Sequence, residues 1–561
     1  MRLRLLSLAA SLLFQGSSAF AYLPLIYTPA DGSGAFTLKR YDNTGIQVNL
    51  NNLIVAGLTS SLSGKNVTVI SANTDPFSTL QSALAAWNSI RSANIRFQPL
   101  QSTGKVGDRT DLQNVVFMAG TADDLSVLGG PNGALAVTIS ANALADGNLQ
   151  SGLAVKKGQI YDSDIMINPS YAFSADSSAG TADLESVLAH ELGHLLGANH
   201  SGLMGATMNP FPSFVTGRYL GSDEKAYATF TYPAAAGALG TLSGKVAVGD
   251  GTTPVKFGLL TFIDQAAGTM FGGLTASDGT YSIQIPPGNY IIYAEPFNSL
   301  ISPGNIYEPG TPGGILDGSQ VTTGYLPTLL TGPGGSPATQ TVAAGAATAV
   351  PLLIAGSGSS GISIPFIGQG TAGGSGGSFT LVSFTGPQTI TSGQTFDLLL
   401  SNGGVDATTT LQLYGPQGIS IKPGSVRIDP SGVTVNGQPL LRATIVVAPQ
   451  LSIGLSTLWL TKGSGVTSFT GGLIITPPHP DSQQRAGCRK QPHHDCPRFV
   501  GCDLWKQPFG VRPSGMGSPR FRQRQPPPEQ PGWRHRHLQR NISPGLFHRA
   551  RTNECAGAWQ H

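Results

Sequence analysis

The histidines of this chain are unevenly distributed, and three of them share one short motif. Before residue 479 the 561-residue sequence contains only His190, His194 and His200, all within the run HELGHLLGANH. On a helix, residues four apart lie on nearly the same face, so His190 and His194 can direct two ring nitrogens at one ion. Gly197 can adopt a left-handed conformation that ends the helix and lets His200 return. The spacing therefore predicts a three-histidine metal site.

Such a site is suited to zinc-dependent hydrolysis. Three protein ligands leave one tetrahedral position of Zn²⁺ for water, whereas structural zinc sites usually close with four cysteine or histidine ligands. Cysteine is absent before residue 488. Zn²⁺ can lower the pKa of its water towards about 7 and polarise a substrate carbonyl. Glu191 lies beside the ligands and is one of only five glutamates before residue 479, so it is the natural general base.

Two other interpretations stay open at this level. His190 and His194 can line an ordinary helix face, with Gly197 serving only as a C-cap. The same three histidines can also hold zinc without catalysis, although Glu191 is intact and no fourth protein ligand is evident. The helical context of the motif decides the first alternative, and an activity measurement decides the second.

The motif resembles HExxHxxGxxH of the metzincin metallopeptidases, and the following residues resemble their matrixin branch. In HSGLMGATMNP, Met208 precedes Asn209 and Pro210 at the spacing of the matrixin Met-turn beneath the zinc. Met204 competes for this role, but it follows His200 closely and has no proline after it. An astacin-like site would place a tyrosine ligand where Asn209 stands. The resemblance implies a zinc endopeptidase whose partners are protein or peptide substrates.

The resemblance covers most of residues 40–235. The stretch DLESVLAHELGH resembles the matrixin active-site helix, and residues 220–233 resemble the C-terminal helix, with Asp223 and Glu224 at its usual acidic pair. The stretch GQIYDSDIMIN resembles the strand before the site. The composition departs from the matrixin pattern in two ways. No upstream histidine is available for a second, structural zinc, and no upstream cysteine is available for a cysteine-switch prosegment.

Structural calcium is a further expectation, because calcium takes oxygen ligands from aspartates. The candidates are Asp123, Asp124, Asp162 and Asp164. The alternative is that these residues are ordinary solvated loop aspartates.

Local patterns predict the elements that position the motif. Thr181 is the expected N-cap of the active-site helix, with Asp183 and Glu185 in its first turn, where the helix dipole favours acidic residues. Asp75 and Pro76 are expected to begin an earlier helix. Between these helices, the segments IQVNLN, NIRFQPL, NVVFMAG and IYDSDIMIN are expected to be strands. Alternating helices and strands predict an α/β (α+β) catalytic domain over residues 40–235.

Two all-β domains are expected after the catalytic domain. Residues 236–356 resemble a carboxypeptidase-regulatory-like β-sandwich through ASDGTYSIQIPPGNYIIYAEP. Residues 357–377 have the composition of a Gly/Ser-rich linker. Residues 378–477 show short strands and suggest an immunoglobulin-like sandwich. Neither domain shows a reactive cluster of residues, so spacing, stability or attachment to a cell surface or matrix is expected.

The N-terminus predicts secretion. Residues 1–21 combine Arg2 and Arg4 with an apolar run and the small residues Ala19 and Ala21, which indicates a signal peptide followed by a short segment at 22–39. The alternative is an uncleaved anchor. No later stretch reaches the length of about twenty apolar residues that spans a bilayer, so the mature protein is expected to be extracellular without a membrane span.

Residues 478–561 differ in composition from the rest. From residue 479 onward there are 14 Lys plus Arg against 5 Asp plus Glu, giving +9, while the preceding part carries 19 − 25 = −6. The segment is expected to be disordered. A basic arm for nucleic acid or polysaccharide and a metal site are alternatives, although specific nucleic-acid binding is not expected. The residues of that metal site would be Cys488, Cys496, Cys502, His493 and His494. The abrupt change also suggests a shifted reading frame near residues 478–486.

Together these patterns predict a secreted zinc metalloendopeptidase with a matrixin-like domain, two β-sandwich domains and a disordered tail. Glu191 is the expected general base, His190, His194 and His200 are the expected zinc ligands, and Met208 is expected to form the Met-turn. The alternative is a surface-binding or adhesive protein whose zinc-binding peptidase module is inactive.

Overall fold

The computed structural model describes residues 24–27, 36–297, 321–476 and 550–551. Short gaps occur within them at 177, 212–213, 365, 372–378, 382–386 and a few positions after 400. All described residues belong to one compact unit formed by 1–478 and 549–561. The predicted signal peptide lies outside the described residues, and so does the predicted tail except for 550–551.

The first half of the chain is built on a twisted, mostly parallel sheet with the strand order β7-β4-β8-β12-β9. Neighbouring strands run parallel except for β9, which is antiparallel to β12. Two short strands extend this sheet: β3 (Lys39–Arg40) pairs parallel with the start of β12, and β36 (Ala550–Arg551) pairs antiparallel with β9. The five main strands are β4 (Val48–Asn51), β7 (Gln101–Thr103), β8 (Asn114–Met118), β9 (Ala136–Asn142) and β12 (Gln159–Ile167).

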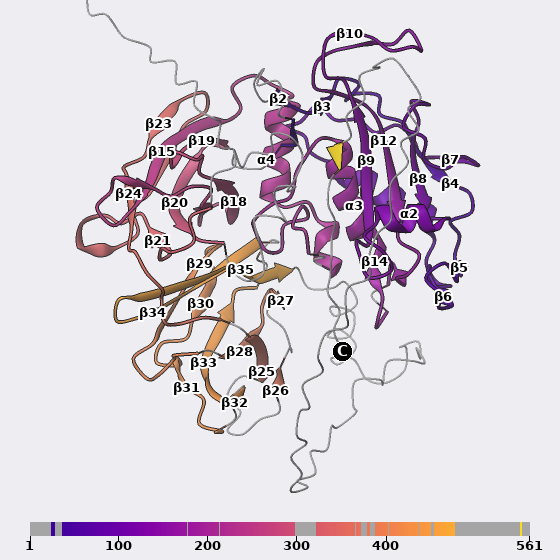
Figure 1. Cartoon of the computed structure of the whole chain (residues 1–561). Helices are drawn as coiled ribbons and strands as arrows, with labels where there is room; N and C mark the ends of the chain where they lie inside the picture. The colour runs from indigo at the N-terminus through magenta and orange to yellow at the C-terminus, as the bar shows by residue number, and fades with distance from the viewer. Residues whose placement is uncertain are drawn as a thin grey trace, which may run out of the picture. The chain divides into compact units, whose positions relative to one another are not determined.

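Two helices, α1 (Pro76–Asn88) and α3 (Leu184–Leu195), pack against each other and contribute to one core with the sheet. Figure 1 shows α3 beside β9. Asp75 caps α1 by accepting hydrogen bonds from the first turn, which confirms the predicted start. The N-cap of α3 is Asp183, whose side chain accepts from the Ser186 amide, so the prediction of Thr181 is wrong. Residues 182–183 instead form a short strand that leads directly into α3.

Shorter elements complete this domain. Helix α2 (Ala122–Val127) precedes β9, and η1 (Phe214–Arg218) and α4 (Ser222–Thr231) follow the histidine motif. Four short strand pairings lie in the connections: β1 (Ile26–Tyr27) with β2 (Phe36–Thr37), β5 (Thr59–Ser60) with β6 (Val67–Thr68), β10 (Gly147–Asn148) with β11 (Ala154–Val155), and β13 (Phe173–Ser174) with β14 (Ala182–Asp183).

One predicted strand is absent and one strand was not predicted. Residues 94–100 form only an isolated bridge between Phe97 and Ile46, and the strand β7 begins at Gln101. Pro99 lies in that segment and has no amide hydrogen to donate to a ladder, which explains why regular pairing fails there. Strand β9, in contrast, was not predicted from the sequence.

Residues 240–355 form two β-sheets around an apolar interior. One sheet has the order β16-β15-β19 with β23 and β24 also on β15, and the other has the order β18-β17-β20-β21 with β22 on β20. A short helix, η2 (Pro333–Gly335), lies between β21 and β22. The strands are β15 (Gly240–Val248), β16 (Thr253–Pro254), β17 (Leu259–Asp264), β18 (Thr269–Leu274), β19 (Thr280–Ile285), β20 (Gly288–Glu295), β21 (Thr328–Leu329), β22 (Thr339–Val342), β23 (Ala347–Ala349) and β24 (Leu353–Ala355). We call residues 240–355 the first β-module.

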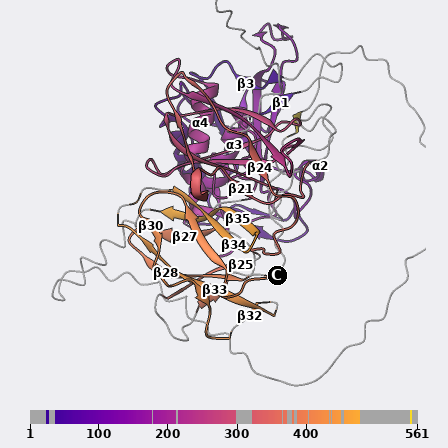
Figure 2. The same cartoon turned by 90° about the vertical axis from the view of Figure 1, so that its left-hand side faces the viewer.

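Residues 366–476 form a second pair of sheets, β26-β25-β28-β33-β30 with β31 and β32 on β33, and β27-β35-β34-β29 (Figure 2). The strands are β25 (Phe366–Thr371), β26 (Phe379–Leu381), β27 (Gln388–Thr391), β28 (Thr395–Ser401), β29 (Thr410–Tyr414), β30 (Ile419–Ile421), β31 (Arg427–Ile428), β32 (Thr434–Val435), β33 (Gln438–Val447), β34 (Gly454–Lys462) and β35 (Gly465–Thr476). We call residues 366–476 the second β-module.

The start of the second β-module corrects the predicted linker at 357–377. Strand β25 lies inside that range and pairs with β28 along six residues. The Gly/Ser composition of the surrounding residues obscured a short segment whose Ile367 is fully buried. Among the described residues, no helix is long and apolar enough to cross a bilayer.

Candidate metal centre

The three histidines of the motif converge at the end of α3. His190 and His194 lie one turn apart on this helix, and His200 returns after a turn at Gly197, whose φ is +95°. A side chain at Gly197 would overlap the carbonyl oxygen of Leu38, so the turn needs both the conformation and the small size of glycine. The Nε2 atom of His194 lies 3.0 Å from Nε2 of His190 and 3.2 Å from Nε2 of His200.

The hydrogen bonds of the histidine rings determine which nitrogen carries a lone pair towards this point. Nδ1 of His190 lies 2.8 Å from the carbonyl oxygen of Thr207, and Nδ1 of His194 lies 2.8 Å from that of Ala198. A carbonyl oxygen only accepts, so both Nδ1 atoms carry the proton and both Nε2 atoms of the neutral rings present lone pairs. Two lone pairs facing each other at 3.0 Å repel unless a cation lies between them. The residues therefore fit a divalent metal ion.

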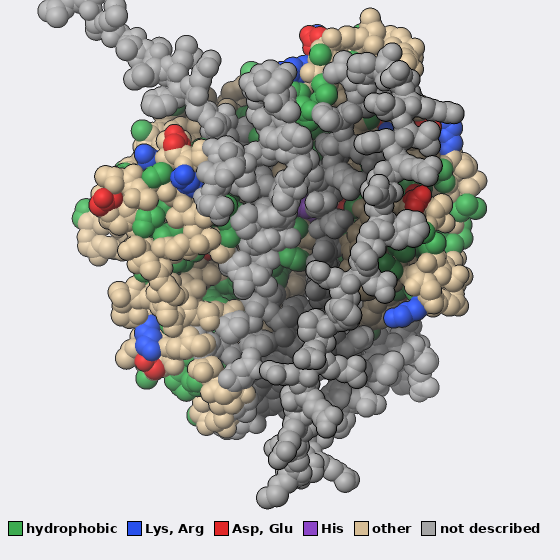
Figure 3. Space-filling view, in the orientation of Figure 1, with side chains coloured by type: hydrophobic (Ala, Val, Ile, Leu, Met, Phe, Trp, Pro, Cys, Tyr) green, Lys and Arg blue, Asp and Glu red, His purple; other side chains and the backbone are tan. Residues whose placement is uncertain are grey.

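The protonation state of the rings agrees with this arrangement. The three side chains are at most 5% exposed, and histidine shows only as a small patch in the space-filling view (Figure 3). Burial lowers the pKa of His190 to about 4 and lowers the pKa of His194 well below its ordinary value. The rings of His190 and His194 are therefore neutral near pH 7, which is the form that binds metal. Among the described residues, these histidines are the one group of three or more side chains able to share a metal ion.

Glu191 lies between the two helical ligands in sequence and is 2% exposed. Its Oε2 atom accepts a hydrogen bond of 2.6 Å from the hydroxyl of Thr138 on β9, the strand that was not predicted. Burial raises the pKa of Glu191 to about 7, and the Thr138 bond opposes that rise. A carboxyl group with a pKa near neutrality can both accept and release a proton, which suits general acid–base work.

Met208, the residue predicted to form the Met-turn, lies against α3 close to Gly193. A side-chain carbon added at Gly193 would overlap the Met208 sulfur, so the glycine of HELGH allows the close approach of this methionine to α3. Met204 packs instead into a core of the second β-module. Asn209 is not a ligand, since its amide donates to the carbonyl oxygens of Ser201 and Leu203.

The acidic pair at the start of α4 holds the segment that carries Met208. Glu224 accepts from the Met208 amide at 2.9 Å, and Asp223 accepts from the Ser201 hydroxyl at 2.6 Å. Both carboxyl groups are buried, and burial raises their pKa values, that of Asp223 to about 8. These residues therefore support the metal centre through the backbone around Met208.

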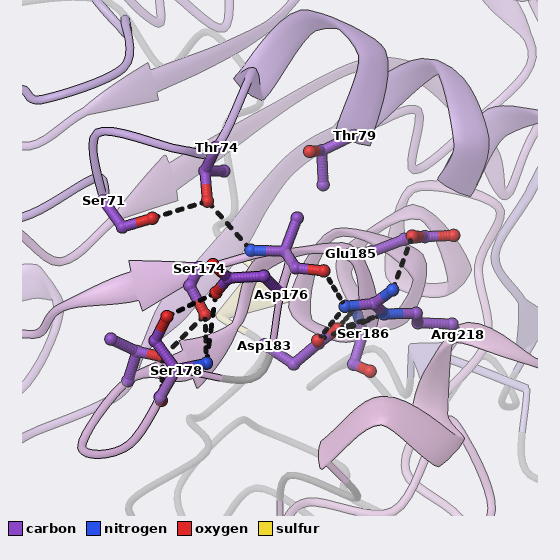
Figure 4. Close-up of polar contacts among 12 residues, drawn as sticks. Ser71, Thr74, Thr79, Ser174, Asp176, Ser178, Asp183, Glu185, Ser186 and Arg218 are labelled. Atoms are coloured by element: carbon purple, nitrogen blue, oxygen red, sulfur yellow. Dashed lines mark hydrogen bonds and ion pairs between the residues drawn. The ribbon is translucent and has the colours of Figure 1, made fainter. Parts of the chain in front are cut away.

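Arg218 ties the end of η1 to the first turn of α3 (Figure 4). Its guanidinium donates to both carboxylate oxygens of Asp183, lies 3.6 Å from a carboxylate oxygen of Glu185 and donates to the carbonyl of Ala175. Asp183 is also the N-cap, so one carboxylate both begins α3 and anchors the chain that follows Met208. Arg218 carries no signal in the sequence, because only the fold places it beside Asp183.

A cavity lies apart from the histidines, at the junction of the matrixin-like part with the β-modules. It has a volume of about 520 Å³ and lies between the start of α4, the first β-module and the second β-module. Tyr219, Lys225, Met270 and Leu455 are among its lining residues. Its chemistry is mixed, and we assign it no role.

The aspartates proposed for calcium are not brought together as one site. Asp124 forms the capping box of α2 with Thr121, and Asp123 lies in the same first turn. Asp162 and Asp164 are buried on β12. One carboxylate oxygen of Asp162 accepts from the Leu112 amide, and one of Asp164 accepts from the Val115 amide. The other oxygen of each has no hydrogen-bond partner among the described residues. Calcium at Asp162 and Asp164 therefore stays a prediction.

Asp162 gives a pH-dependence that can be measured. Burial and the neighbouring Asp164 raise its pKa to about 8. Because the folded-state pKa lies above that of an unfolded aspartate, the contribution of Asp162 to stability is fully present below about pH 4 and is lost as the pH rises through about 8. Asp162→Asn, which mimics the protonated form, is expected to reduce the fall in the free energy of unfolding between pH 5 and pH 8.

The measurement is urea unfolding of both proteins at the two pH values, in zinc-containing buffer with and without added calcium. In the calcium-free buffer the variant should be at least as stable as the wild type at pH 8. A lower stability of the variant under that condition would contradict the assignment. A stabilisation by calcium that only the wild type shows would place the cation at Asp162.

The comparison with protein families decides the identity of the first domain. Residues 57–224 match the family model described as matrixin. Residues 57–224 form a matrixin domain. With its three-histidine cluster, the matrixin domain is that of a zinc metalloendopeptidase. This match lies inside the predicted range 40–235 and contains every residue predicted to bind or activate zinc.

Other comparisons are less informative. No curated protein matches the chain. Among solved structures, a major pilin subunit of Bacillus cereus, in a variant form, is 11% identical, with 43% of this chain and 69% of that chain covered and a TM-score of 0.13. The major pilin SpaD from Corynebacterium diphtheriae is 7% identical, with 42% and 64% covered and a TM-score of 0.13. Likenesses this low carry no argument about the fold or function of the β-modules.

Proposed function

We propose that this protein is a secreted zinc metalloendopeptidase in which Glu191 is the general base. The single observation that carries the proposal is the convergence of three buried imidazoles whose Nε2 atoms lie close together, with a carboxyl group between two of them in sequence. Three such ligands leave a tetrahedral ion open for a reactant, whereas a structural site would be closed.

His190, His194 and His200 would hold the zinc ion, and the carbonyl oxygens of Thr207 and Ala198 would orient two of these rings. When bound, Zn²⁺ supplies a Lewis acid that polarises the scissile carbonyl and makes water a stronger acid. Glu191 would accept a proton from the attacking water and deliver it to the leaving amine. Thr138 would keep the carboxyl group of Glu191 in place through its hydrogen bond.

The substrate is proposed to bind as an extended peptide along β9. This strand runs antiparallel to the rest of the sheet, carries Thr138 and contacts α3. A strand at the border of a sheet offers unpaired amides and carbonyls to an added strand. The antiparallel pairing of β36 with Ser140 and Ile139 supports the proposal that the free edge of β9 can bind an added strand.

Secretion rests on the N-terminal residues alone. Residues 1–21 have the composition of a signal peptide, and they lie outside the described residues. The absence of cysteine before residue 488 means that the catalytic domain and both β-modules need no disulfide in that environment.

The test is digestion of unfolded casein by the purified full chain. Cleavage is expected to stop after treatment with a zinc chelator and to return when zinc is restored. Zinc bound at one per chain without any cleavage of casein or of a broad peptide library would favour the alternative, an adhesive protein with an inactive peptidase module.

A further inference from the structure

The segment that carries Met208 is covered from outside by both β-modules. We call residues 201–209 the Met-turn segment. Leu203 and Ala206 share an apolar cluster with residues from both modules, and Met204 lies in a second such cluster. Leu203, Met204 and Ala206 are each at most 5% exposed. The outer side of this segment therefore packs against residues that follow the matrixin domain in sequence.

The first β-module is joined to the same region by polar contacts. The Ser222 hydroxyl donates to the carbonyl of Met270 and accepts from its amide, at 2.7 and 3.0 Å. The amide of Gly272 donates to Asp223 at 2.9 Å, on the carboxylate oxygen that Ser201 does not use. A buried carboxyl group thus links the Met-turn segment to strand β18.

The second β-module makes its closest approach at Gly471 on β35. This glycine has a φ of +70°, and a side-chain carbon added to it would overlap the carbonyl oxygen of Met204. The approach is also close at Gly205, where an added carbon would lie 2.8 Å from Ile474 and 2.9 Å from Leu455. The backbone of the Met-turn segment therefore fits against β35 and β34 without an intervening side chain at two points.

The inner side of the Met-turn segment faces the histidines. The carbonyl oxygen of Thr207, three residues after Met204, accepts from Nδ1 of His190, and Met208 packs beneath Gly193. Because close-packed interiors transmit displacements, a shift of the backbone at Met204 would move the Thr207 carbonyl that orients a ligand. The contacts thus form a continuous path from β35 to the metal centre.

We propose that Gly471 is a positioning residue of the metal centre, and that the second β-module holds the Met-turn segment in the conformation that binds zinc. The inference rests on the proposed function only in taking the three histidines as zinc ligands. It gives the β-modules a role inside the peptidase, in place of the spacing or attachment expected from the sequence. A side chain at residue 471 would act on zinc binding through Met204 and Thr207.

The test compares Gly471→Ala with Gly463→Ala in the full-length protein. Both glycines have positive φ values, +70° and +57°, and both belong to the β34–β35 region, but a side-chain carbon at Gly463 meets no heavy atom within 4 Å. The two variants therefore share the backbone strain and differ in the contact with Met204. Zinc affinity is measured by competition with a chelator, and ligand geometry by the absorption spectrum of the Co²⁺-loaded protein.

Gly471→Ala is expected to weaken zinc binding by about 10- to 100-fold, the range seen when residues that orient a ligand are changed, and to alter the Co²⁺ spectrum. Gly463→Ala should match the wild type in both readouts. Equal zinc affinity and identical spectra for the two variants would overturn the proposal. Neither readout depends on cleavage, so a catalytically inactive wild type would refute the proposed function while this comparison still stands.

If Gly471→Ala does not fold, Met204 provides a second pair of variants. Met204→Ala leaves a cavity at the junction, whereas Met204→Leu keeps most of the volume. Weaker zinc binding in Met204→Ala, restored in Met204→Leu, would support the proposal. Unchanged zinc binding in Met204→Ala, together with a lower unfolding midpoint, would show a merely structural junction and overturn it.

Discussion

Glu191→Gln is expected to lower kcat/KM for an unfolded protein or peptide substrate by about a thousandfold, within the range that general acid–base catalysis contributes. The reason is that glutamine keeps the size of the side chain and an oxygen that can accept the Thr138 hydroxyl, but it cannot take a proton from water. Zinc content should stay at one ion per chain, measured by elemental analysis beside the cleavage assay. Lost activity with retained zinc would show that Glu191 acts as the base and not as a metal ligand.

Glu185→Gln is the matched control, because Glu185 lies on the same helix and is partly buried beside Arg218. Its activity should stay close to that of the wild type, since its carboxylate lies beside Arg218 at the opposite end of the helix from His194. Residual activity of Glu191→Gln within tenfold of the wild type would remove Glu191 from its role. An equal loss in both variants would mean that the first turn of α3, and not the base, had been disturbed.

His194→Ala is expected to abolish cleavage by removing zinc. His194 is the central ligand of the cluster, since its Nε2 lies within 3.2 Å of both other Nε2 atoms. Changing a residue that only orients a ligand weakens metal binding by about 10- to 100-fold, so loss of a direct ligand should weaken it by at least about a hundredfold. Zinc content after dialysis, measured by elemental analysis, should fall far below one ion per chain.

The same substitution in the basic segment, His494→Ala, serves as the control and tests the alternative metal site with Cys488 and Cys496. Zinc content and cleavage should be unchanged in this variant. If zinc content fell in His494→Ala and persisted in His194→Ala, the metal would belong to the C-terminal segment, and the assignment of the catalytic ligands would be wrong.

The β-modules are not independent of the matrixin domain, because the first of them shares a buried carboxyl group with it. The carboxyl group of Asp223 accepts one hydrogen bond from the Met-turn segment and one from β18. Removal of the first β-module would leave this buried carboxyl group without one of its donors, which is costly in an apolar environment. Variants in the full chain are therefore the sound way to probe the peptidase.

The sequence alone was sufficient to predict the metal ligands, because their spacing is a property of helix geometry. His190 and His194 share a helix face whatever surrounds them, and Gly197 supplies the left-handed turn at any C-terminus of this kind. Met208 followed from a resemblance of spacing, and the start of α1 followed from Asp75 and Pro76. These are local features. The structure confirms the clustering of the three histidines, the turn at Gly197 and the start of α1, whereas the role of Met208 stays a prediction.

What surrounds the ligands was decided by tertiary structure. Thr138 reaches Glu191 from a strand that precedes it by more than fifty residues. Asp183, and not Thr181, begins the active-site helix, and its carboxylate also pairs with Arg218 from a distant segment. The backbone of Met204 lies against Gly471, and no sequence pattern marks a glycine for such a contact. The spacing of a motif can be read from the sequence, whereas these contacts exist only after folding has brought together residues that are far apart in sequence.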